Sequence, residues 1–377
     1  MNIDIHTLHD ANNYGSLCQA VATRLVFARY GRARLVNYRN RHVSRHLRTV
    51  RTGLSPRDML RTGKDLLRLS SRKRAMARFR DFLAQHGNLT PPLYDGVDVA
   101  RATRDADVLV AGSDQIWNPP CVTGFDHFDP VYLLAMGPPR ARRIAYASSR
   151  GAYRYNAMQA QRLHRHLAKF YALSVRERDT AEYFARLLDR PVETVLDPTL
   201  LLDQKEWRAL ASPLPELPSA YVLAYLFDKT PRAVRALDKV RRALMLPVVV
   251  LDQDLRAGVP CDWHIRDAGP AEFLSAFAGA AYVVSDSFHG ACFATNFGKP
   301  LLPLARPGRS NRVETLLDTV GGRARLVYND AQLETVRVMY DTAPHRAALA
   351  RARAKSLAWI EQALASEPLA RTAGGEA

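Results

Sequence analysis

The residues best suited to chemistry lie in a polar turn between an apolar segment and a helix-like segment. Residues 281–284 suit a buried strand, and residues 288–297 have the composition of an amphipathic helix. Residues 285–287 stand between them as N-cap residue types. This order places His289 and free backbone N–H groups at the amino end of a helix, where open α/β sheets bind small anions. An ordinary capped turn with a packed histidine is the alternative interpretation.

Three further polar turns follow expected strands, at residues 13–16, 112–119 and 174–177. The carboxyl ends of parallel strands line one edge of a doubly wound sheet, so all four turns are expected to face one cleft. Arg176 ends an apolar strand, where a guanidinium typically binds a carboxylate or phosphate, although an ion pair with Glu177 would also explain it. The candidate ligand-binding residues of the four turns are Asn13, Gly15, Ser113, Asp114, Arg176, Ser285, Ser287 and Gly290.

Other charged groups give weaker signals. Arg306, Arg309 and Arg312 form a basic run after an expected strand at 301–304, and Arg312 is included as a second candidate anion ligand. A surface charge run would have the same composition. Residues 126–129 contain metal-ligand types, but no regular element holds them, so we expect no metal site.

The elements that must position these residues alternate between strand and helix patterns. The expected strands are residues 2–7, 34–38, 107–111, 143–147, 173–176, 194–196, 220–226, 246–251, 281–284 and 326–328. A first helix is expected at 17–30 and a last one at 345–364. Three prolines at 212–218 indicate a linker. We therefore predict an α/β protein with two Rossmann-like domains, 1–211 and 219–377, facing a cleft, with a basic helical excursion at about 40–86.

Length and composition favour a globular protein in a reducing compartment. The chain has 377 residues, is 47% hydrophobic and contains four widely spaced cysteines without CxxC spacing. The first fifteen residues lack the basic and apolar regions of a signal peptide, and the longest apolar run, 273–284, is too short to cross a bilayer. We expect a cytoplasmic protein. No GxGxxG fingerprint follows the first strand, and no redox cofactor is expected.

The net charge of +17 is concentrated in residues 31–80, which contain 16 Lys and Arg against Asp58 and Asp65. A solvated helical surface and a surface that meets anionic lipid head groups on the inner face of the cytoplasmic membrane are both open interpretations. Aromatic residues do not interleave with these basic residues, so nucleic acid is not an expected partner.

The ordered motifs of the chain resemble the polysaccharide pyruvyltransferase family. The resemblance rests on six segments that together span about residues 1–320: NYGSLCQA, AGSDQIWNP, RIAYASSRG, LSVRERDT, VLDPTLLL and SDSFHGACFATNFGKP. It implies a fold similar to GT-B glycosyltransferases. It also implies transfer of a pyruvyl group from phosphoenolpyruvate to a sugar of a cell-surface or secreted glycan precursor, or of a lipid-linked acceptor, as a ketal.

On this resemblance, Arg176 matches the arginine for the donor and His289 the histidine of the second domain, where it would act as acid or base near neutral pH. The sequence departs from the family at Ser287-Phe288-His289, where well-studied branches have an Arg-Leu-His type sequence. The basic run at 306–312 could replace the missing guanidinium, or the donor could differ.

Two alternatives of other kinds remain open at this stage. A nucleotide-sugar glycosyltransferase of GT-B type would use the same architecture and would bind a nucleotide diphosphate at the helix after residue 287. A non-catalytic membrane-surface protein would use the basic segment 31–80 and leave the cleft without a ligand.

Overall fold

Two parallel β-sheets, each covered by helices, form the two units of the chain. The computed structural model describes residues 1–45, 62–63, 65–214 and 217–365. The first sheet has six strands in the order β2 (Arg32–Leu35), β1 (Asn2–His6), β3 (Val108–Ala111), β4 (Arg142–Ser148), β5 (Ala172–Val175) and β6 (Glu193–Thr194). The second has five, in the order β11 (Leu301–Pro303), β10 (Tyr282–Ser285), β7 (Val222–Tyr225), β8 (Val248–Leu251) and β9 (Trp263–Ile265). The predicted fold of two parallel-sheet α/β units is confirmed.

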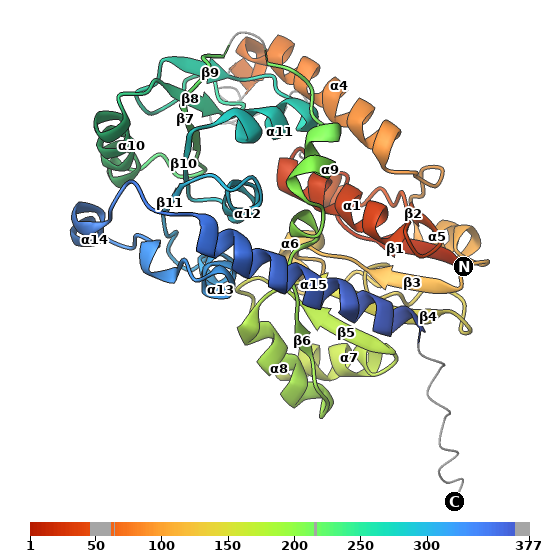
Figure 1. Cartoon of the computed structure of the whole chain (residues 1–377). Helices are drawn as coiled ribbons and strands as arrows, with labels where there is room; N and C mark the ends of the chain where they lie inside the picture. Colours follow the sequence, from red (N-terminus) through yellow and green to blue (C-terminus); the bar gives the residue numbers. More distant parts are fainter. Residues whose placement is uncertain (46–61, 64, 215–216, 366–377) are drawn as a thin grey trace, which may run out of the picture.

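Helices connect the strands within each unit (Figure 1). In the first they are α1 (Tyr14–Phe27), α2 (Arg41–Ser44), α4 (Leu69–His86), α5 (Gly96–Ala102), α6 (Pro119–Val122), α7 (Ala157–Leu167), α8 (Arg178–Leu188), the 3-10 turn η2 (Pro198–Leu200) and α9 (Gln204–Ala209). In the second they are α10 (Pro231–Leu244), α11 (Pro270–Gly279), α12 (Phe288–Asn296), α13 (Asn311–Val320), η3 (Arg323–Arg325), α14 (Asp330–Thr335) and α15 (Ala343–Ala365). Among the described residues, none of these helices has the length and apolarity needed to span a membrane.

The central strands consist of apolar, often β-branched residues because both faces of each sheet are covered. All four residues of β3, β7, β8 and β10 are buried. Parallel pairing of β1 with β3 and of β10 with β7 brings the carboxyl ends of these strands to the same edges of their sheets. The turns that leave those ends therefore face the space between the two units.

One hydrophobic cluster spans both units, and each unit also has a cluster of its own. The Tyr14 ring of α1 stacks on Phe273 of α11, with ring centroids 4.7 Å apart, and the Tyr14 hydroxyl donates to the carbonyl of Ala268 at 2.8 Å. Asn12 and Gln253 exchange two side-chain hydrogen bonds between the same two units. Offset aromatic pairs of this kind stabilise an interface beyond the area that they bury. The two halves are therefore packed against each other directly.

The last helix, α15, leaves the second unit and runs along the first (Figure 1). Trp359 packs on Tyr146 of β4, and Ser356 accepts a hydrogen bond from the backbone N–H of Leu196 at 3.1 Å. The helix has no marked amphipathic pattern that would specify which sheet it covers, and the predicted division at 219–377 places it in the second unit alone. We propose that α15 belongs to both units.

The basic excursion is partly used for contacts between the units. Helix α4 carries Arg74, which pairs with Asp267 at 2.7 Å, and Arg78, which pairs with Glu272 at 3.3 Å. Both carboxylates belong to the second unit. Much of the predicted excursion, residues 46–61 and 64, lies outside the described residues, as do residues 215–216 of the predicted linker.

Candidate active site

A cavity of about 880 Å³ lies between the carboxyl edges of the two sheets, and we name it the inner cavity. Its walls come from both units. Among its lining residues are Asn12, Asn13, Ser16, Asp114 and Gln115 from the first unit, and Asp286, Ser287, Phe288, His289, Arg306, Arg309 and Arg312 from the second. A concave site with converging polar groups at the carboxyl ends of parallel strands is the common location of ligands in α/β proteins.

The turn before α12 is built by its own hydrogen bonds. The Ser287 hydroxyl caps the helix by accepting from the N–H of Gly290 at 3.3 Å, and Ser285 donates to the carbonyl of Tyr225 at 2.6 Å. Asp286 accepts from the backbone N–H groups of residues 227 and 228, so it anchors the loop after β7. The other first-turn N–H groups of α12 have no partner within the helix, which suits an anion.

Gly290 and Ser285 are positioned beneath this turn and do not line the inner cavity. A Cβ atom at Gly290 would lie 2.2 Å from the Ser285 Oγ, so the close contact requires glycine. The predicted ligand roles of Ser285 and Gly290 are therefore corrected: they hold the turn. Ser287 does line the cavity, as expected from its N-cap position.

His289 reaches across to the first unit and packs against α1. It is 8% exposed, and a Cβ atom at Gly15 would lie 2.0 Å from its Nδ1. Gly15 therefore makes room for the imidazole and does not itself line the cavity. The Nε2 atom is buried without a hydrogen-bond partner and lies 3.9 Å from Oδ2 of Asp197.

The buried position of His289 changes its expected acid–base behaviour. Burial lowers the pKa of the imidazole to about 4, although Asp197 acts in the opposite direction. This lowered pKa disagrees with the predicted acid or base near neutral pH, because burial favours the neutral imidazole. Its pKa would rise when an anion enters the cavity, because a nearby negative charge favours the protonated form.

Arg176 lies in a buried network of carboxylates and does not face the inner cavity. Its guanidinium bonds Asp197 at 2.8 Å and Asp114 at 3.2 Å, and its Nε bonds Glu177 at 3.4 Å. Ser113 accepts from the same guanidinium at 3.2 Å. These partners occupy the fork that was predicted to hold the donor, so Arg176 is corrected to a residue that organises the site. A residue at the end of a strand does not reveal by its position which distant carboxylates surround it.

The carboxylates of this network have pKa values that are shifted in different directions. Burial is the largest single influence on Asp114 and would raise its pKa, but Arg176 and His289, with the hydrogen bond from Ser16, together lower that pKa to about 2. Burial raises the pKa of Glu177 above its ordinary value despite Arg176. Of these two, only Asp114 lines the cavity, where it also accepts a hydrogen bond from Ser16.

Asp197 is a residue that the sequence did not single out. It follows β6 at the start of η2, where its Oδ1 accepts from the N–H of Thr199 at 3.0 Å and from the Thr199 hydroxyl at 2.7 Å. Its Oδ2 accepts from Arg176 and, at 3.0 Å, from Ser113. An aspartate before proline suggests only a cap, and the segment VLDPTLLL was the one signal for it.

Arg312 is the cation best placed for an anion in the inner cavity. It is half-buried, lines the cavity and forms no ion pair within the described part of the chain. The Phe288 ring contacts two guanidinium groups, since its centroid lies 5.5 Å from Arg312 Cζ and 4.9 Å from Arg176 Cζ. Burial, with Arg176 nearby, lowers the pKa of Arg312 from its ordinary value, as expected for a cation without a counter-ion.

The two remaining arginines of the basic run differ from each other. Arg306 forms a two-bond pair with Asp228, at 2.7 and 3.0 Å, whereas Arg309 is exposed and forms no ion pair among the described residues. Asn13, the other predicted ligand of the first unit, caps α1 by accepting from Ser16 at 3.1 Å and lines the cavity.

Comparisons with solved structures agree with this fold at low sequence identity. A putative UDP-N-acetylglucosamine 2-epimerase from Listeria monocytogenes has a TM-score of 0.51 at 10% identity, covering 97% of this chain and 98% of its own. The UDP-N-acetylglucosamine 2-epimerase from Rickettsia bellii has a TM-score of 0.50 at 8% identity, covering 96% of each chain. Alr3699/HepE of Anabaena, in complex with UDP and glucose, gives 0.49 at 11% identity, covering 97% of this chain and 100% of its own. The predicted GT-B-like architecture is confirmed.

Comparison with family models identifies the chain more specifically. No curated protein matched it. The model of the family described as polysaccharide pyruvyl transferase matches residues 13–307, which include lining residues from both walls of the inner cavity but not Asn12, Arg309 or Arg312. The chain therefore belongs to the polysaccharide pyruvyl transferase family.

Proposed function

We propose that this protein transfers a pyruvyl group from phosphoenolpyruvate to two hydroxyls of a sugar in a glycan precursor, giving a ketal and free phosphate. One observation carries the proposal: Arg312 and the amino end of α12, with His289, converge on the inner cavity opposite Ser16 and Asp114. A donor with a carboxylate and a phosphate needs cations and helix N–H groups in a water-poor cleft.

Arg312 takes the place of the guanidinium that Ser287 lacks. Its guanidinium lies 5.5 Å from the ring centroid of Phe288, the residue that follows Ser287, and it forms no ion pair among the described residues. Arg176 supports this arrangement from behind through Asp114 and the Phe288 ring. In this proposal Arg312 binds the donor and Arg176 positions the groups around it.

The reaction needs one proton at the methylene carbon of the donor. In the proposed sequence, protonated His289 gives its proton to that carbon while a sugar hydroxyl attacks C2 and returns a proton to the imidazole. The second hydroxyl then attacks C2, the bond from C2 to the phosphate oxygen breaks, and its proton leaves with phosphate. The negative donor raises the low pKa of His289 on binding, so that the imidazole is protonated when it is needed.

The proposal also gives a location, because phosphoenolpyruvate is a cytoplasmic metabolite. Peripheral attachment to an anionic membrane surface through residues 31–80 is a separate part of it. The described arginines of α4 at positions 74 and 78 already pair with the second unit, so attachment would depend on other basic residues of the segment. Salt-sensitive binding to liposomes of anionic lipid tests this part, and absence of binding contradicts it.

Mass spectrometry of the surface glycan, with and without this protein, tests the reaction. An increment of roughly 70 daltons for each ketal-linked pyruvate is expected, since the transferred group comes from the donor. In vitro, phosphate release from phosphoenolpyruvate must depend on the acceptor. A thermal-shift screen separates the glycosyltransferase alternative: stabilisation by nucleotide sugars without any by phosphoenolpyruvate would contradict the proposed donor.

A further inference from the structure

A second cavity opens beside the inner one, and we name it the outer cavity. Its volume is about 730 Å³, and it shares Arg306 and Arg309 with the inner cavity as lining residues. Residues 150–155 and α8 of the first unit form one wall, and residues 305–311 with α13 form the other. A ligand that fills the inner cavity could therefore continue past Arg309 into the outer one.

The outer cavity is lined by an excess of arginines, three of which, at positions 150, 232 and 306, already contact a carboxylate. Five arginines line it against two carboxylates, Asp179 and Glu314. Arg154 and Arg309 are exposed and form no ion pair in the part of the chain that the structure describes. Arg232 contacts Asp330 at 3.4 Å with both side chains partly in solvent, which leaves donors for a ligand. Arginine forks of this kind bind phosphate or carboxylate groups with two parallel hydrogen bonds.

Aromatic residues share this cavity with the arginines. Tyr155 and Tyr183 lie with ring centroids 5.6 Å apart, and both line the wall of the first unit. The Tyr155 hydroxyl donates to the carbonyl of Trp117 at 2.7 Å, so this residue offers its ring, which suits the apolar face of a sugar. A saccharide that carries a negative charge would match both the arginines and the tyrosine rings of this cavity.

We propose that the outer cavity binds the part of the acceptor that lies away from the reacting hydroxyls, and that this part bears a phosphate or a carboxylate. The inference rests on the proposed function for the role of the ligand as acceptor. The chemistry of recognition rests on the cavity alone. Arg154, Arg232 and Arg309 hold the anionic group, while the terminal sugar reaches His289 in the inner cavity.

Binding of small probes tests this without turnover. Glucose 1-phosphate, glucuronic acid and uncharged glucose are titrated by saturation-transfer NMR, with and without saturating phosphoenolpyruvate to occupy the inner cavity. The charged probes are expected to bind at least about tenfold more tightly than glucose. Arg154→Gln with Arg232→Gln removes two cations that line only the outer cavity, and should weaken the charged probes by about fivefold or more. Preference for glucose 1-phosphate assigns a phosphate, and preference for glucuronic acid a carboxylate.

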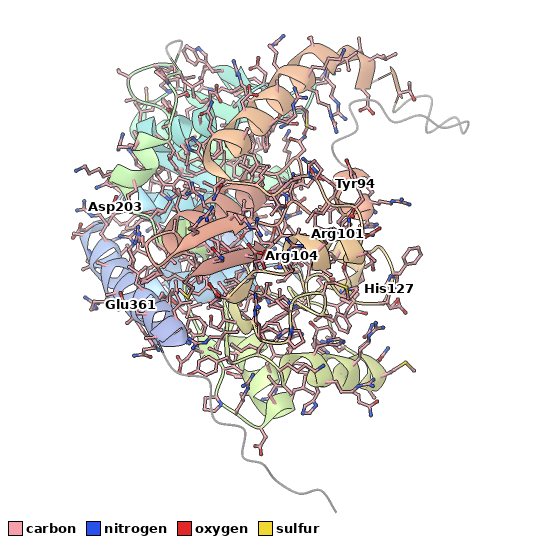
Figure 2. The ribbon with its side chains drawn as sticks, turned by 90° about the vertical axis from the view of Figure 1, so that its right-hand side faces the viewer. Tyr94, Arg101, Arg104, His127, Asp203 and Glu361 are labelled. Atoms are coloured by element: carbon pink, nitrogen blue, oxygen red, sulfur yellow. The ribbon has the colours of Figure 1, made fainter. Side chains whose placement is uncertain are left out.

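A matched control comes from an arginine outside both cavities. Arg101 on α5 has a side chain 73% exposed and is labelled in Figure 2, and Arg101→Gln should leave all three affinities unchanged. Equal binding of charged and uncharged probes, or charged probes indifferent to the double substitution, would overturn the inference. If phosphoenolpyruvate fails to bind while the charged probes still require Arg154 and Arg232, the proposed donor is wrong and this inference stands.

Discussion

Nε2 of His289 lies 3.9 Å from Oδ2 of Asp197, and the two residues come from different units of the fold. The same carboxylate oxygen accepts from Arg176 at 2.8 Å. One aspartate therefore links the buried arginine of the first unit to the histidine of the second. This link explains how groups that are far apart in the chain form one site.

Replacing His289 tests its place in the mechanism. His289→Ala should lower the rate of acceptor-dependent phosphate release by at least about 100-fold, because no other imidazole lines the described cavity to move the proton. The fold should survive, as circular dichroism and thermal unfolding would show. A folded variant with wild-type turnover would remove His289 from the reaction.

The close contact of Gly15 gives a sharper test of geometry. Gly15→Ala places a methyl group 2.0 Å from His289 Nδ1, so the imidazole must move. We expect kcat/KM to fall by about 100-fold, because small misplacements of a catalytic group are costly. Gly63→Ala, where an added Cβ meets nothing within 4 Å, is the control and should remain active.

Arg176 should affect stability as well as activity. Arg176→Met leaves Asp114, Glu177 and Asp197 buried without their shared cation, which should lower the free energy of unfolding by about 3–5 kcal/mol. Arg176→Lys should also be impaired, because an ammonium group cannot reproduce the fork. Urea denaturation measures both.

The neighbouring Arg178 is the matched control for this effect. Its side chain is 63% exposed, and its contact with the carboxylate of Asp318 is long, at 4.0 Å. Arg178→Met should therefore change the unfolding free energy by less than about 0.5 kcal/mol. Equal effects at positions 176 and 178 would show that the carboxylate network does not depend on Arg176.

Arg312→Gln distinguishes an effect on donor affinity from an effect on the stability of the fold. Because Arg312 has no ion pair among the described residues, its loss should leave stability nearly unchanged and weaken phosphoenolpyruvate binding about tenfold or more. Calorimetric titration with the donor measures this. Arg242→Gln, at a side chain 79% exposed on α10, should bind the donor as the wild type does. Unchanged donor affinity in Arg312→Gln would contradict the proposed role of Arg312 in binding phosphoenolpyruvate.

Two buried histidines, His289 and His6, should make the folded state less stable at acid pH. The pKa of His289 falls to about 4 through burial, below its ordinary value of 6.5, so the folded state binds fewer protons than the unfolded state between these values. Stability should fall as pH drops from about 6.5 to 4, by up to about 3 kcal/mol for this group. Burial lowers the pKa of His6 to about 3, and His6 acts in the same direction.

The measurement is the urea midpoint at several pH values for wild type and His289→Asn. The variant should have a shallower decline below pH 6.5, with the contribution of His6 remaining. Parallel curves for the two proteins would contradict the assignment of this acid sensitivity to His289.

Much of the fold could be predicted because local patterns and sheet position agree. The apolar strands β3, β8 and β10 are buried on both faces, which their composition already indicates. Helix boundaries were less accurate: α1 begins at Tyr14 rather than residue 17 because Asn13 supplies its N-cap, and it ends at Phe27 rather than residue 30. Strand β9 was missed since its three residues are too few to show a period. The expected strand at 326–328 is only a bridge between Leu304 and Val327.

The site was harder to predict because its contacts connect distant parts of the chain. Arg176 meets Asp114 from 62 positions earlier and Asp197 from 21 positions later. A sequence shows that an arginine ends a strand but not which carboxylates surround it. The turn at 285–287 and His289 were predictable because strand, cap and helix are contiguous.

Stacking of Tyr14 on Phe273 has a consequence for how this protein can change over evolution. Tyr14 directly precedes Gly15 in the chain. The residue that packs the two units together is therefore next to the residue that makes room for the His289 imidazole. A chimera that took one half from a distant relative would have to match the aromatic faces as well as the catalytic groups. Substitutions at the Tyr14–Phe273 contact would therefore alter reactivity without changing any group that contacts a substrate.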